Sequence, residues 1–197
     1  MDKDTREKLI EAATPLFAWK GFAGASIREL AKAADVNSAL ISYHFGGKEG
    51  LYAAVLHTHL THLLSALEQV SRSTADPEER IRLFIKTVSD IHKEKPFLLR
   101  LLQGELINPS VYFEKVLVTS FKKLITFLPA TVAEGKDLGK FAPDIHPLYA
   151  SVALVSMVNF YFIIRPLAEQ IFPQDLNRDE EYIKQVARIY LKGVKEE

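Results

Sequence analysis

The sequence contains no cysteine, and its formal charges cancel. Without thiols the chain has no disulfide framework, no thiolate nucleophile and no cysteine-based zinc site, and this absence fits a reducing cytoplasm. A basic excess, which many nucleic-acid-binding proteins carry, is also missing, because 25 Lys and Arg residues face 25 Asp and Glu residues. If the chain binds DNA, its affinity must therefore come from individual contacts at fixed positions rather than from an overall positive charge.

Signals for β-strands are missing as well. The sequence has no alternation of Val, Ile and Thr bounded by hairpin turns, no internal repeat and no low-complexity stretch. Its 197 residues, 48% of them hydrophobic, suit one large domain or a small domain joined to a medium one. The polar start MDKDTREKL is neither a signal peptide nor a transit peptide. We therefore expect an all-α cytoplasmic protein.

The first predicted helix runs from about Asp4 to Lys20. Asp4 and Glu7 have the spacing of a capping box, and Gly21 is expected to end the helix. The apolar stripe consists of Leu9, Ala13, Leu16 and Phe17.

Two short helices follow. Ser26 and Glu29 form a second capping box at the start of one. Residues 35–37 make a tight turn, and the other helix covers about 38–45 before two glycines end it. Ile27, Leu30, Ala31 and Ala34 are expected to face inward.

Two short helices joined by a three-residue turn, with a supporting helix before them, are typical of a helix-turn-helix. Such a unit places its second helix in the major groove of DNA. Val36, Ile41 and Phe45 are expected to face the core. The residues left to point outward are Asn37, Ser38, Ala39, Leu40, Ser42, Tyr43 and His44. Small and polar side chains suit base edges and thymine methyl groups, whereas the alternative is a buried Leu40 beside ordinary surface residues.

Further helices are predicted along the rest of the chain. A long helix from Lys48 carries a stripe of leucines, and 76–79 has the acidic, proline-containing start of the next helix. The expected stripes are Leu56, Leu60, Leu63, Leu67 and Val70, then Ile81, Phe84, Ile85, Val88 and Ile91. Later helices are expected from Pro96 to Leu106, from Asn108-Pro109 to about 128, from 145 to 172 and from 179 to 191, with Gly135, Gly139 and Pro143 in a loop. We place the boundary between the DNA-binding domain (1–47) and a helical effector-binding and dimerisation domain (48–197) near Lys48.

The run SIRELAKAADVNSALISYHFGGKEGLYAAVL resembles the DNA-binding segment of the TetR (tetracycline-repressor-like) family. Two features carry the resemblance. One is the preceding helix with Phe17 and Gly21, and the other is the aromatic-His-Phe-x-x-Lys-Glu pattern that starts at Tyr43. The resemblance covers about residues 5–56, and within the family the segment is most similar to a CecR-type subgroup.

The resemblance implies a role for each residue of this segment. Ser26 would cap its helix and bind a phosphate, and Arg28 would contact a guanine, unless it only forms a surface salt bridge. Asn37, Ser38, Ala39, Leu40 and Ser42 would face the major groove, and Tyr43, His44 and Lys48 would reach phosphates. The alternative for Lys48 is an ordinary surface lysine.

The sequence departs from the family pattern at two positions. Asp35 stands where the turn usually has glycine, and aspartate tolerates the left-handed conformation that glycine supplies. Ser42 stands where family members commonly have an aromatic residue, which puts its base contact in doubt.

The resemblance also implies a homodimer, usually a repressor, that binds double-stranded operator DNA and is released by a small-molecule effector. The apolar run 148–164 is expected to be buried on both sides, in a dimer interface shared with Tyr182, Ile183, Val186, Ile189 and Tyr190. A membrane span is the competing interpretation, although the run is short for one. Gln103, Asn108, Tyr112, Asn159 and Tyr161 are candidates for the effector pocket.

No catalytic, metal or cofactor site is predicted. His57, His59 and His62 lack the i, i+4 spacing of a helical zinc site, so we expect them to pack or to line a pocket. An all-helical enzyme would need a nucleophile, carboxylate or metal set that the spacing does not provide. A helical interaction or membrane-associated protein with a vestigial helix-turn-helix remains the other alternative.

Overall fold

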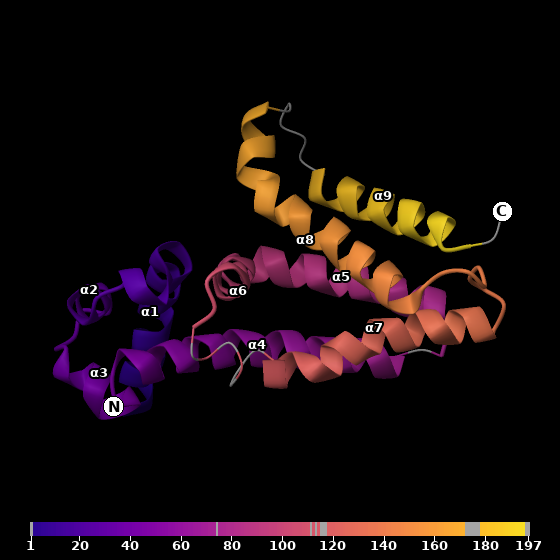
Figure 1. Cartoon of the computed structure of the whole chain (residues 1–197). Coiled ribbons are helices and arrows are strands. Elements are labelled where there is room, and N and C mark those ends of the chain that lie inside the picture. Colours follow the sequence, from indigo (N-terminus) through magenta and orange to yellow (C-terminus); the bar gives the residue numbers. More distant parts are fainter. Residues whose placement is uncertain are drawn as a thin grey trace. The chain divides into compact units, whose positions relative to one another are not determined.

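The computed structural model describes residues 2–73, 75–110, 112, 114, 118–171 and 178–195, and over these residues all regular secondary structure is helical (Figure 1). The all-α prediction is confirmed. The elements are α1 (Asp2–Gly24), α2 (Ile27–Ala33), α3 (Ala39–Phe45), α4 (Lys48–Ser73), α5 (Pro77–Glu94), α6 (Leu98–Ile107), α7 (Thr119–Asp137), α8 (Pro147–Ile171) and α9 (Arg178–Gly193).

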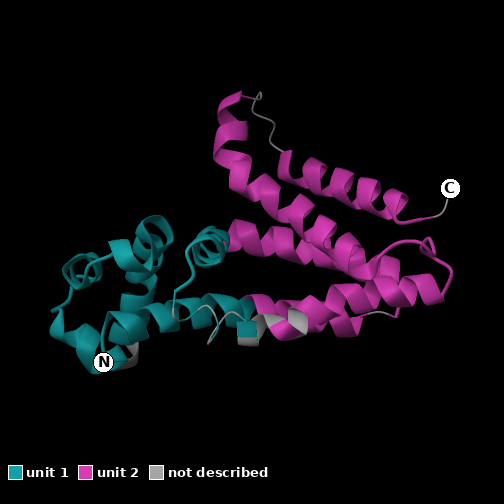
Figure 2. Ribbon diagram, in the orientation of Figure 1, with its two compact units in different colours: residues 1–62, 95–120 teal, residues 63–94, 121–197 magenta. Residues whose placement is uncertain are grey.

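The chain forms two compact units, which Figure 2 shows in different colours. Unit 1 comprises residues 1–62 and 95–120, and unit 2 comprises residues 63–94 and 121–197. Helix α4 therefore contributes to both units, and α6 belongs to the same unit as the three N-terminal helices. The units do not divide at Lys48, so the functional boundary there stays a prediction.

Helix α1 is broken at Gly21, whose backbone (φ 68°, ψ 175°) leaves the helical region. Glycine adopts a positive φ at little cost. Gly21 was predicted to end the helix and does interrupt it, but helical residues continue to Gly24. The predicted start was wrong, because α1 begins at Asp2 and Asp4 lies inside its first turn. The stripe is buried at Leu9, Ala13 and Phe17 and half-buried at Leu16.

Helix α5 begins as predicted at a capped first turn. The Asp76 carboxylate accepts a hydrogen bond from the backbone N–H of Glu78 at 2.8 Å and one from the Lys140 ammonium at 2.7 Å. The bond from Lys140, and then the bond from Glu78, hold the pKa of the Asp76 carboxyl below its usual range. The predicted inner faces of α4 and α5 are both buried: Leu56, Leu60, Leu63, Leu67, Val70, Ile81, Phe84, Ile85, Val88 and Ile91.

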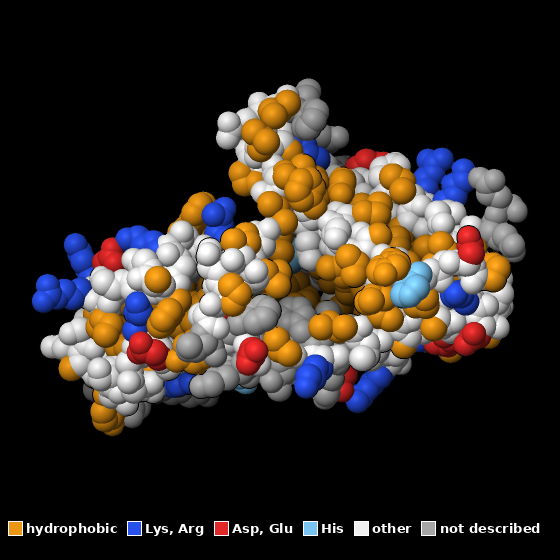
Figure 3. All heavy atoms as spheres, in the orientation of Figure 1, with side chains coloured by type: hydrophobic (Ala, Val, Ile, Leu, Met, Phe, Trp, Pro, Cys, Tyr) orange, Lys and Arg blue, Asp and Glu red, His pale blue; other side chains and the backbone are white. Residues whose placement is uncertain are grey.

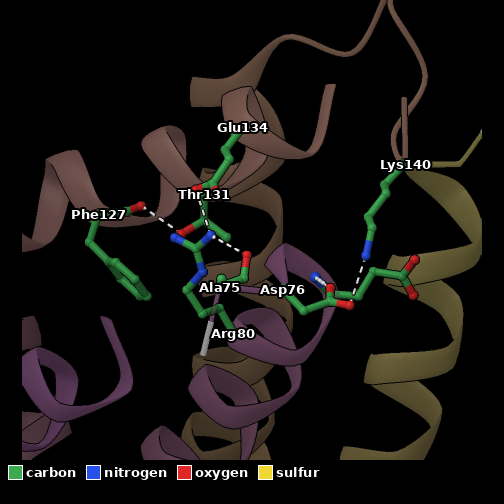
Figure 4. Close-up of polar contacts among 8 residues, drawn as sticks. Ala75, Asp76, Arg80, Phe127, Thr131, Glu134 and Lys140 are labelled. Atoms are coloured by element: carbon green, nitrogen blue, oxygen red, sulfur yellow. Dashed lines mark hydrogen bonds and ion pairs between the residues drawn. The ribbon is translucent and has the colours of Figure 1, made fainter. Parts of the chain in front are cut away.

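Arg80 holds α7 against the first turn of α5 (Figure 4). Its guanidinium donates to the Glu134 carboxylate and to the carbonyl oxygen of Ala75 at 3.1 Å. The side chain of Arg80 is only 12% exposed, so the pair is shielded from solvent more than a surface pair is. No sequence spacing pointed to this contact, because 54 residues separate its partners.

Three predictions for the middle of the chain were wrong. Pro96 does not open α6, which begins at Leu98, and Pro109 does not open a helix, because Pro109 and the next residue are not helical. Most of 111–117, where the predicted helix would begin, lies outside the described residues. Gly135 lies inside α7 rather than in a loop, and a Cβ at this position would come within 2.1 Å of the Phe141 ring.

Helix α8 leaves much of its apolar surface uncovered by the rest of unit 2. It is long and apolar enough to cross a membrane by length and composition alone, but only 22% of its most apolar window is buried. The prediction of burial on both sides therefore does not hold within one chain. In Figure 3, hydrophobic side chains gather over α8. The exposed ones are Leu148, Tyr149, Val152, Phe160, Ile163, Leu167 and Ile171.

The predicted interface residues of α9 divide between two faces. Val186 and Tyr190 are buried inside the subunit, with 2% and 5% of their surface exposed, whereas Ile189 is 59% exposed. Tyr182 is also held within the subunit, since its hydroxyl donates to the carbonyl oxygen of Met157 at 2.7 Å. Assigning Val186 and Tyr190 to a dimer interface was therefore wrong.

The three histidines of α4 do not gather with one another or with acidic side chains: over the described residues, no group of three His, Cys, Asp or Glu side chains is arranged to hold a metal ion. His59 is the member that packs, with its Nε2 at 3.3 Å from the hydroxyl of Thr14. His59 is half-buried. In unit 2, His92 is buried, and its Nε2 lies 2.7 Å from the side-chain oxygen of Asn159.

Burial lowers the pKa of both His59 and His92. Electrostatic interactions with Lys95 and then with His62 add to this effect at His59, and the hydrogen bond to Asn159 opposes it at His92. The neutral imidazoles are therefore favoured more strongly in the folded chain than in the unfolded chain, where they titrate near 6.5. Their contribution to stability is complete above that pH and is lost as the pH falls toward the lower folded pKa.

We expect the urea midpoint of unfolding to fall between about pH 7.5 and about pH 5.5. The double variant His59→Gln, His92→Gln should lose less stability over the same interval, because its unfolded state binds two protons fewer. The carboxyls of Glu29 and Asp76 also have lowered pKa values but titrate at more acidic pH. An equal loss in wild type and variant would show that other groups carry the pH dependence.

Candidate nucleic-acid interface

The capping box predicted at Ser26 is present and begins α2. The Ser26 hydroxyl accepts a hydrogen bond from the N–H of Glu29 at 3.2 Å, and the Ser26 N–H donates to the Glu29 carboxylate at 3.0 Å. The Lys20 ammonium also donates to this carboxylate, at 2.5 Å. Hydrogen bonds from Lys20 and then from Ser26 lower the pKa of Glu29 to about 2. The exposed Ser26 therefore has its predicted capping role.

The turn between α2 and α3 depends on Asp35, the one described non-glycine residue with a positive φ, at 52°. This value lies in the left-handed region that aspartate tolerates, so the prediction that Asp35 replaces the usual glycine is confirmed. The N–H of Val36 then donates to the carbonyl oxygen of Ala31 at 3.0 Å and closes the turn.

Helix α3 is capped at both ends. The side-chain oxygen of Asn37 accepts a hydrogen bond from the N–H of Ala39 at 2.9 Å, whereas Ser38 makes no side-chain cap. At the other end, Gly46 adopts φ 74° and its N–H donates to the carbonyl oxygen of Ser42 at 2.9 Å. Asn37 therefore supports the helix from its start, a role that the sequence interpretation missed.

We name Ser38–His44 without Ile41 the α3 ridge. Ile41 is completely buried beneath it, while Ser38, Ala39, Ser42 and Tyr43 are exposed and Leu40 and His44 are half-buried. The prediction of an outward ridge is correct for four of these positions and only partly so for Leu40 and His44. Val36 and Phe45, predicted to face the core, are half-buried, and Ile27 of α2 is 39% exposed rather than inward.

Arg28 lies on the exposed face of α2. Within the described part of the chain it has no ion pair or hydrogen bond, so the alternative of a helix-surface salt bridge receives no support there. Lys and Arg side chains project from the surface over α2 in Figure 3.

Lys48 has an internal role that the sequence interpretation did not include. Its ammonium donates to the carbonyl oxygens of Phe22 at 2.9 Å and Ala25 at 3.0 Å, and it lies 4.4 Å from the centre of the Phe22 ring. Lys48 therefore connects the start of α4 to the segment between α1 and α2. An ammonium has three N–H donors, and these two acceptors account for two of them.

The junction of α3 and α4 requires glycine at position 50. A Cβ on Gly50 would lie 1.8 Å from the carbonyl oxygen of Phe45, much closer than atoms can approach. The glycine of the Lys-Glu-Gly motif thus lets the end of α3 approach α4, and this constraint was not predicted.

Unit 1 also contains a cavity of about 860 Å³ between the end of α1 and α6. Gln103 and Asn108, two predicted pocket residues, line it. The Arg100 guanidinium, also in its lining, lies 3.6 Å above the ring of Trp19.

Beside this cavity, the buried Glu105 carboxylate connects α6 to α4. It accepts hydrogen bonds from the Tyr52 hydroxyl at 2.6 Å and from the Ser110 N–H at 3.1 Å. Burial, and then this carboxylate, raise the pKa of Tyr52, so Tyr52 acts as the donor.

The remaining pocket candidates lie elsewhere. Tyr112 packs its ring against Phe22 and Tyr52 in unit 1. Asn159 and Tyr161 belong to unit 2, where they contact His92 and Asp179, with the Tyr161 hydroxyl 2.6 Å from the Asp179 carboxylate. The five candidates therefore do not line one described cavity.

Comparison with known proteins agrees with the geometry of α2 and α3. Residues 9–55 match the profile of "Bacterial regulatory proteins, tetR family", and residues 77–195 match that of "Tetracyclin repressor-like, C-terminal domain". The transcriptional repressor NicS of Pseudomonas putida is 26% identical over 159 residues, which cover 80% of this chain and 75% of NicS. The transcriptional regulator RutR of Escherichia coli is 27% identical over 194 residues, 96% of this chain and 90% of RutR.

A solved structure of AibR in complex with isovaleryl coenzyme A and operator DNA shares the fold, with a TM-score of 0.78 at 18% identity. The likeness covers 94% of this chain and 97% of that one. Together the two profiles span both the helix-turn-helix and the C-terminal helices. The chain therefore belongs to the TetR family of bacterial regulatory proteins and is a helix-turn-helix transcription regulator.

Proposed function

We propose that the chain is a cytoplasmic homodimeric repressor that binds pseudo-palindromic double-stranded operator DNA and is released by a small-molecule effector. The observation that carries the proposal is the α3 ridge, because it presents small polar side chains outward above a fully buried Ile41. We keep the division into a DNA-binding domain at 1–47 and an effector-binding and dimerisation domain at 48–197. Repression is the usual activity of this family, and the relative NicS is named a repressor.

In this proposal α3 enters the major groove and α2 crosses the phosphate backbone. Small side chains allow the helix to approach base edges closely, and the partly exposed Leu40 suits a thymine methyl group. The exposed Arg28 reads a guanine with its two-pronged guanidinium. The proposed DNA-contacting residues are Ser26, Arg28, Asn37, Ser38, Ala39, Leu40, Ser42, Tyr43, His44 and Lys48.

Contact with phosphates has to come from few groups, because the first 50 residues contain seven Lys and Arg and seven Asp and Glu. Backbone N–H groups near Ser26 and the remaining N–H of Lys48 supply such contacts at fixed positions. The highly exposed Tyr43 hydroxyl reaches a further phosphate.

Dimerisation is supported by the exposed apolar face of α8. Val152, Phe160, Ile163 and Leu167 recur at helical spacing on this face, and large exposed apolar patches mark interaction sites. The face is assigned here to a second copy of the chain rather than to a bilayer. A two-fold dimer places its recognition helices about 34–36 Å apart, or a multiple of this distance, on successive turns of DNA.

The cavity between α1 and α6 suggests how an effector could act. A small molecule there would contact both α6 and the end of α1, which bears the Gly21 break. Binding that favours one arrangement of these helices would shift the population away from the one that fits DNA. The structure of AibR, which shares this fold, contains both isovaleryl coenzyme A and operator DNA, so a protein of this fold binds a small molecule as well as DNA.

The central test is Arg28→Ala, measured by gel shift and by competition against operators with single base-pair changes, using DNA that flanks the gene of this protein. Loss of a bidentate contact should cost about 1–3 kcal/mol of specific binding and relax selection at one base pair. The matched control is Arg72→Ala, which removes an exposed arginine at the far end of α4. Unchanged selectivity in the Arg28 variant would remove Arg28 from the specificity residues.

Lys48→Ala should weaken binding to every DNA sequence and reduce the slope of log affinity against log salt by about 1. It should also lower thermal stability, because two carbonyl oxygens lose their donor. Lys48→Arg keeps the charge and serves as the control. A less stable Lys48→Ala variant with the wild-type salt slope would mean that Lys48 supports the fold and does not contact DNA.

The double variant Phe160→Glu, Leu167→Glu should be monomeric in analytical ultracentrifugation, because uncompensated buried charges cost several kcal/mol. Two-site operator binding should be lost with the dimer. Ile125→Glu, at an exposed residue of α7, is the matched control and should remain dimeric. A double variant that still sediments as a dimer would place the interface elsewhere.

A further inference from the structure

A second groove, of about 770 Å³, lies between α5 and α9 within unit 2. The two helices run antiparallel, because Lys195 at the end of α9 pairs with Glu78 at the start of α5 at 2.9 Å. The apolar side chains that line the groove are aliphatic: Ile85, Ile183, Ala187 and Leu191. No aromatic side chain is among the described residues that line it.

The groove concentrates positive charge in a chain whose formal net charge is zero. Seven Lys and Arg residues line it, all of them exposed, against Asp90 and Glu180. Lys86 is paired with Asp90, and Lys195 with Glu78. Over the described residues, the cations left without an acidic partner are Arg82, Lys93, Lys184, Arg188 and Lys192. Figure 3 shows Lys and Arg side chains gathered beside the C-terminal end of α9.

A buried hydroxyl without a partner lies in the same groove. Ser89 is 2% exposed, and its Oγ makes no hydrogen bond to any described residue. It is three residues from Lys86 and four from Lys93 along α5, so both lie on its face of the helix. The antiparallel register places Lys184 of α9 at about the same level. Buried hydroxyls are nearly always hydrogen-bonded, so a ligand that reached Ser89 would satisfy it.

These features narrow the chemistry of the occupant. Five exposed cations without an acidic partner favour a ligand with several negative charges, and a phosphate group carries up to two charges and offers three strong acceptor oxygens. The aliphatic lining suits a hydrocarbon segment. A nucleobase would find no aromatic side chain on which to stack, and the volume is that of a small-molecule site.

We infer that the α5–α9 groove binds a soluble phosphorylated small molecule with an aliphatic segment. The phosphate lies near Ser89 between the cations of the two helices, and the hydrocarbon lies on Ile85 and Ala187. This site goes beyond the proposed regulation through α1 and α6, since all of its residues belong to unit 2.

The groove does not include the exposed apolar face of α8 that the proposed dimer uses. On α9, helical residues are about 100° apart around the axis, so the exposed Ile189 lies about 140° from Lys184 and about 60° from Lys192. Ile183, which was predicted for the dimer interface, lines the groove.

Isothermal titration calorimetry of the full chain with octyl phosphate, below its micellar concentration, tests this inference. Saturable binding that weakens with added salt is expected, together with weaker binding of pyrophosphate and none of octyl glucoside. Binding of octyl glucoside as tight as that of octyl phosphate would overturn the inference. Tighter binding to phosphatidic acid vesicles than to octyl phosphate would overturn it too, since it would identify a lipid surface as the ligand.

The variant Lys184→Gln, Arg188→Gln should weaken octyl phosphate binding by at least about tenfold, and Ser89→Ala by about fivefold. The matched control Lys122→Gln removes an exposed cation of α7 and should bind as wild type does. Thermal melting verifies that each variant is folded. Wild-type affinity in the folded double variant would overturn the inference and leave the proposed DNA-binding function untouched, because operator binding is measured separately.

Discussion

The proposed DNA-binding surface depends on the burial of Ile41 beneath the α3 ridge. Helix α3 has seven residues, and an isolated helix of this length is not stable in water. Its order must therefore come from tertiary packing and from its caps. Ile41 is the one fully buried side chain of α3, Leu40, His44 and Phe45 are half-buried, and Asn37 and Gly46 cap the two ends of the helix. All remaining outward positions are then free to be small or polar.

The features that sequence could predict were those determined by neighbours in the chain. The capping box of Ser26 and Glu29, the left-handed turn at Asp35 and the end of α3 at Gly46 each require a particular residue within a few positions. The amphipathic stripes of α4 and α5 were equally readable, because their apolar side chains repeat at the helical period and all of them are buried.

The errors arose where a distant partner decides the outcome. Nothing near Lys48 in the sequence indicates the carbonyl oxygens of Phe22 and Ala25, which lie more than 20 residues away. Gly135 was predicted to lie in a loop, but it lies in a helix, where the absence of a Cβ leaves room for the Phe141 ring. The helical periodicity indicated that Val186 and Tyr190 would be buried. It could not show whether a second subunit or the interior of the same subunit covers them.

Because the Tyr52 hydroxyl is bonded to the buried Glu105 carboxylate, α4 and α6 are mechanically coupled about one turn from the residue where α4 begins. A displacement of α6 must either break the hydrogen bond between Tyr52 and Glu105 or move the first turn of α4 with it. Since Lys48 binds the carbonyl oxygens of Phe22 and Ala25 from that same turn, a displacement of α6 would be transmitted to the segment between α1 and α2.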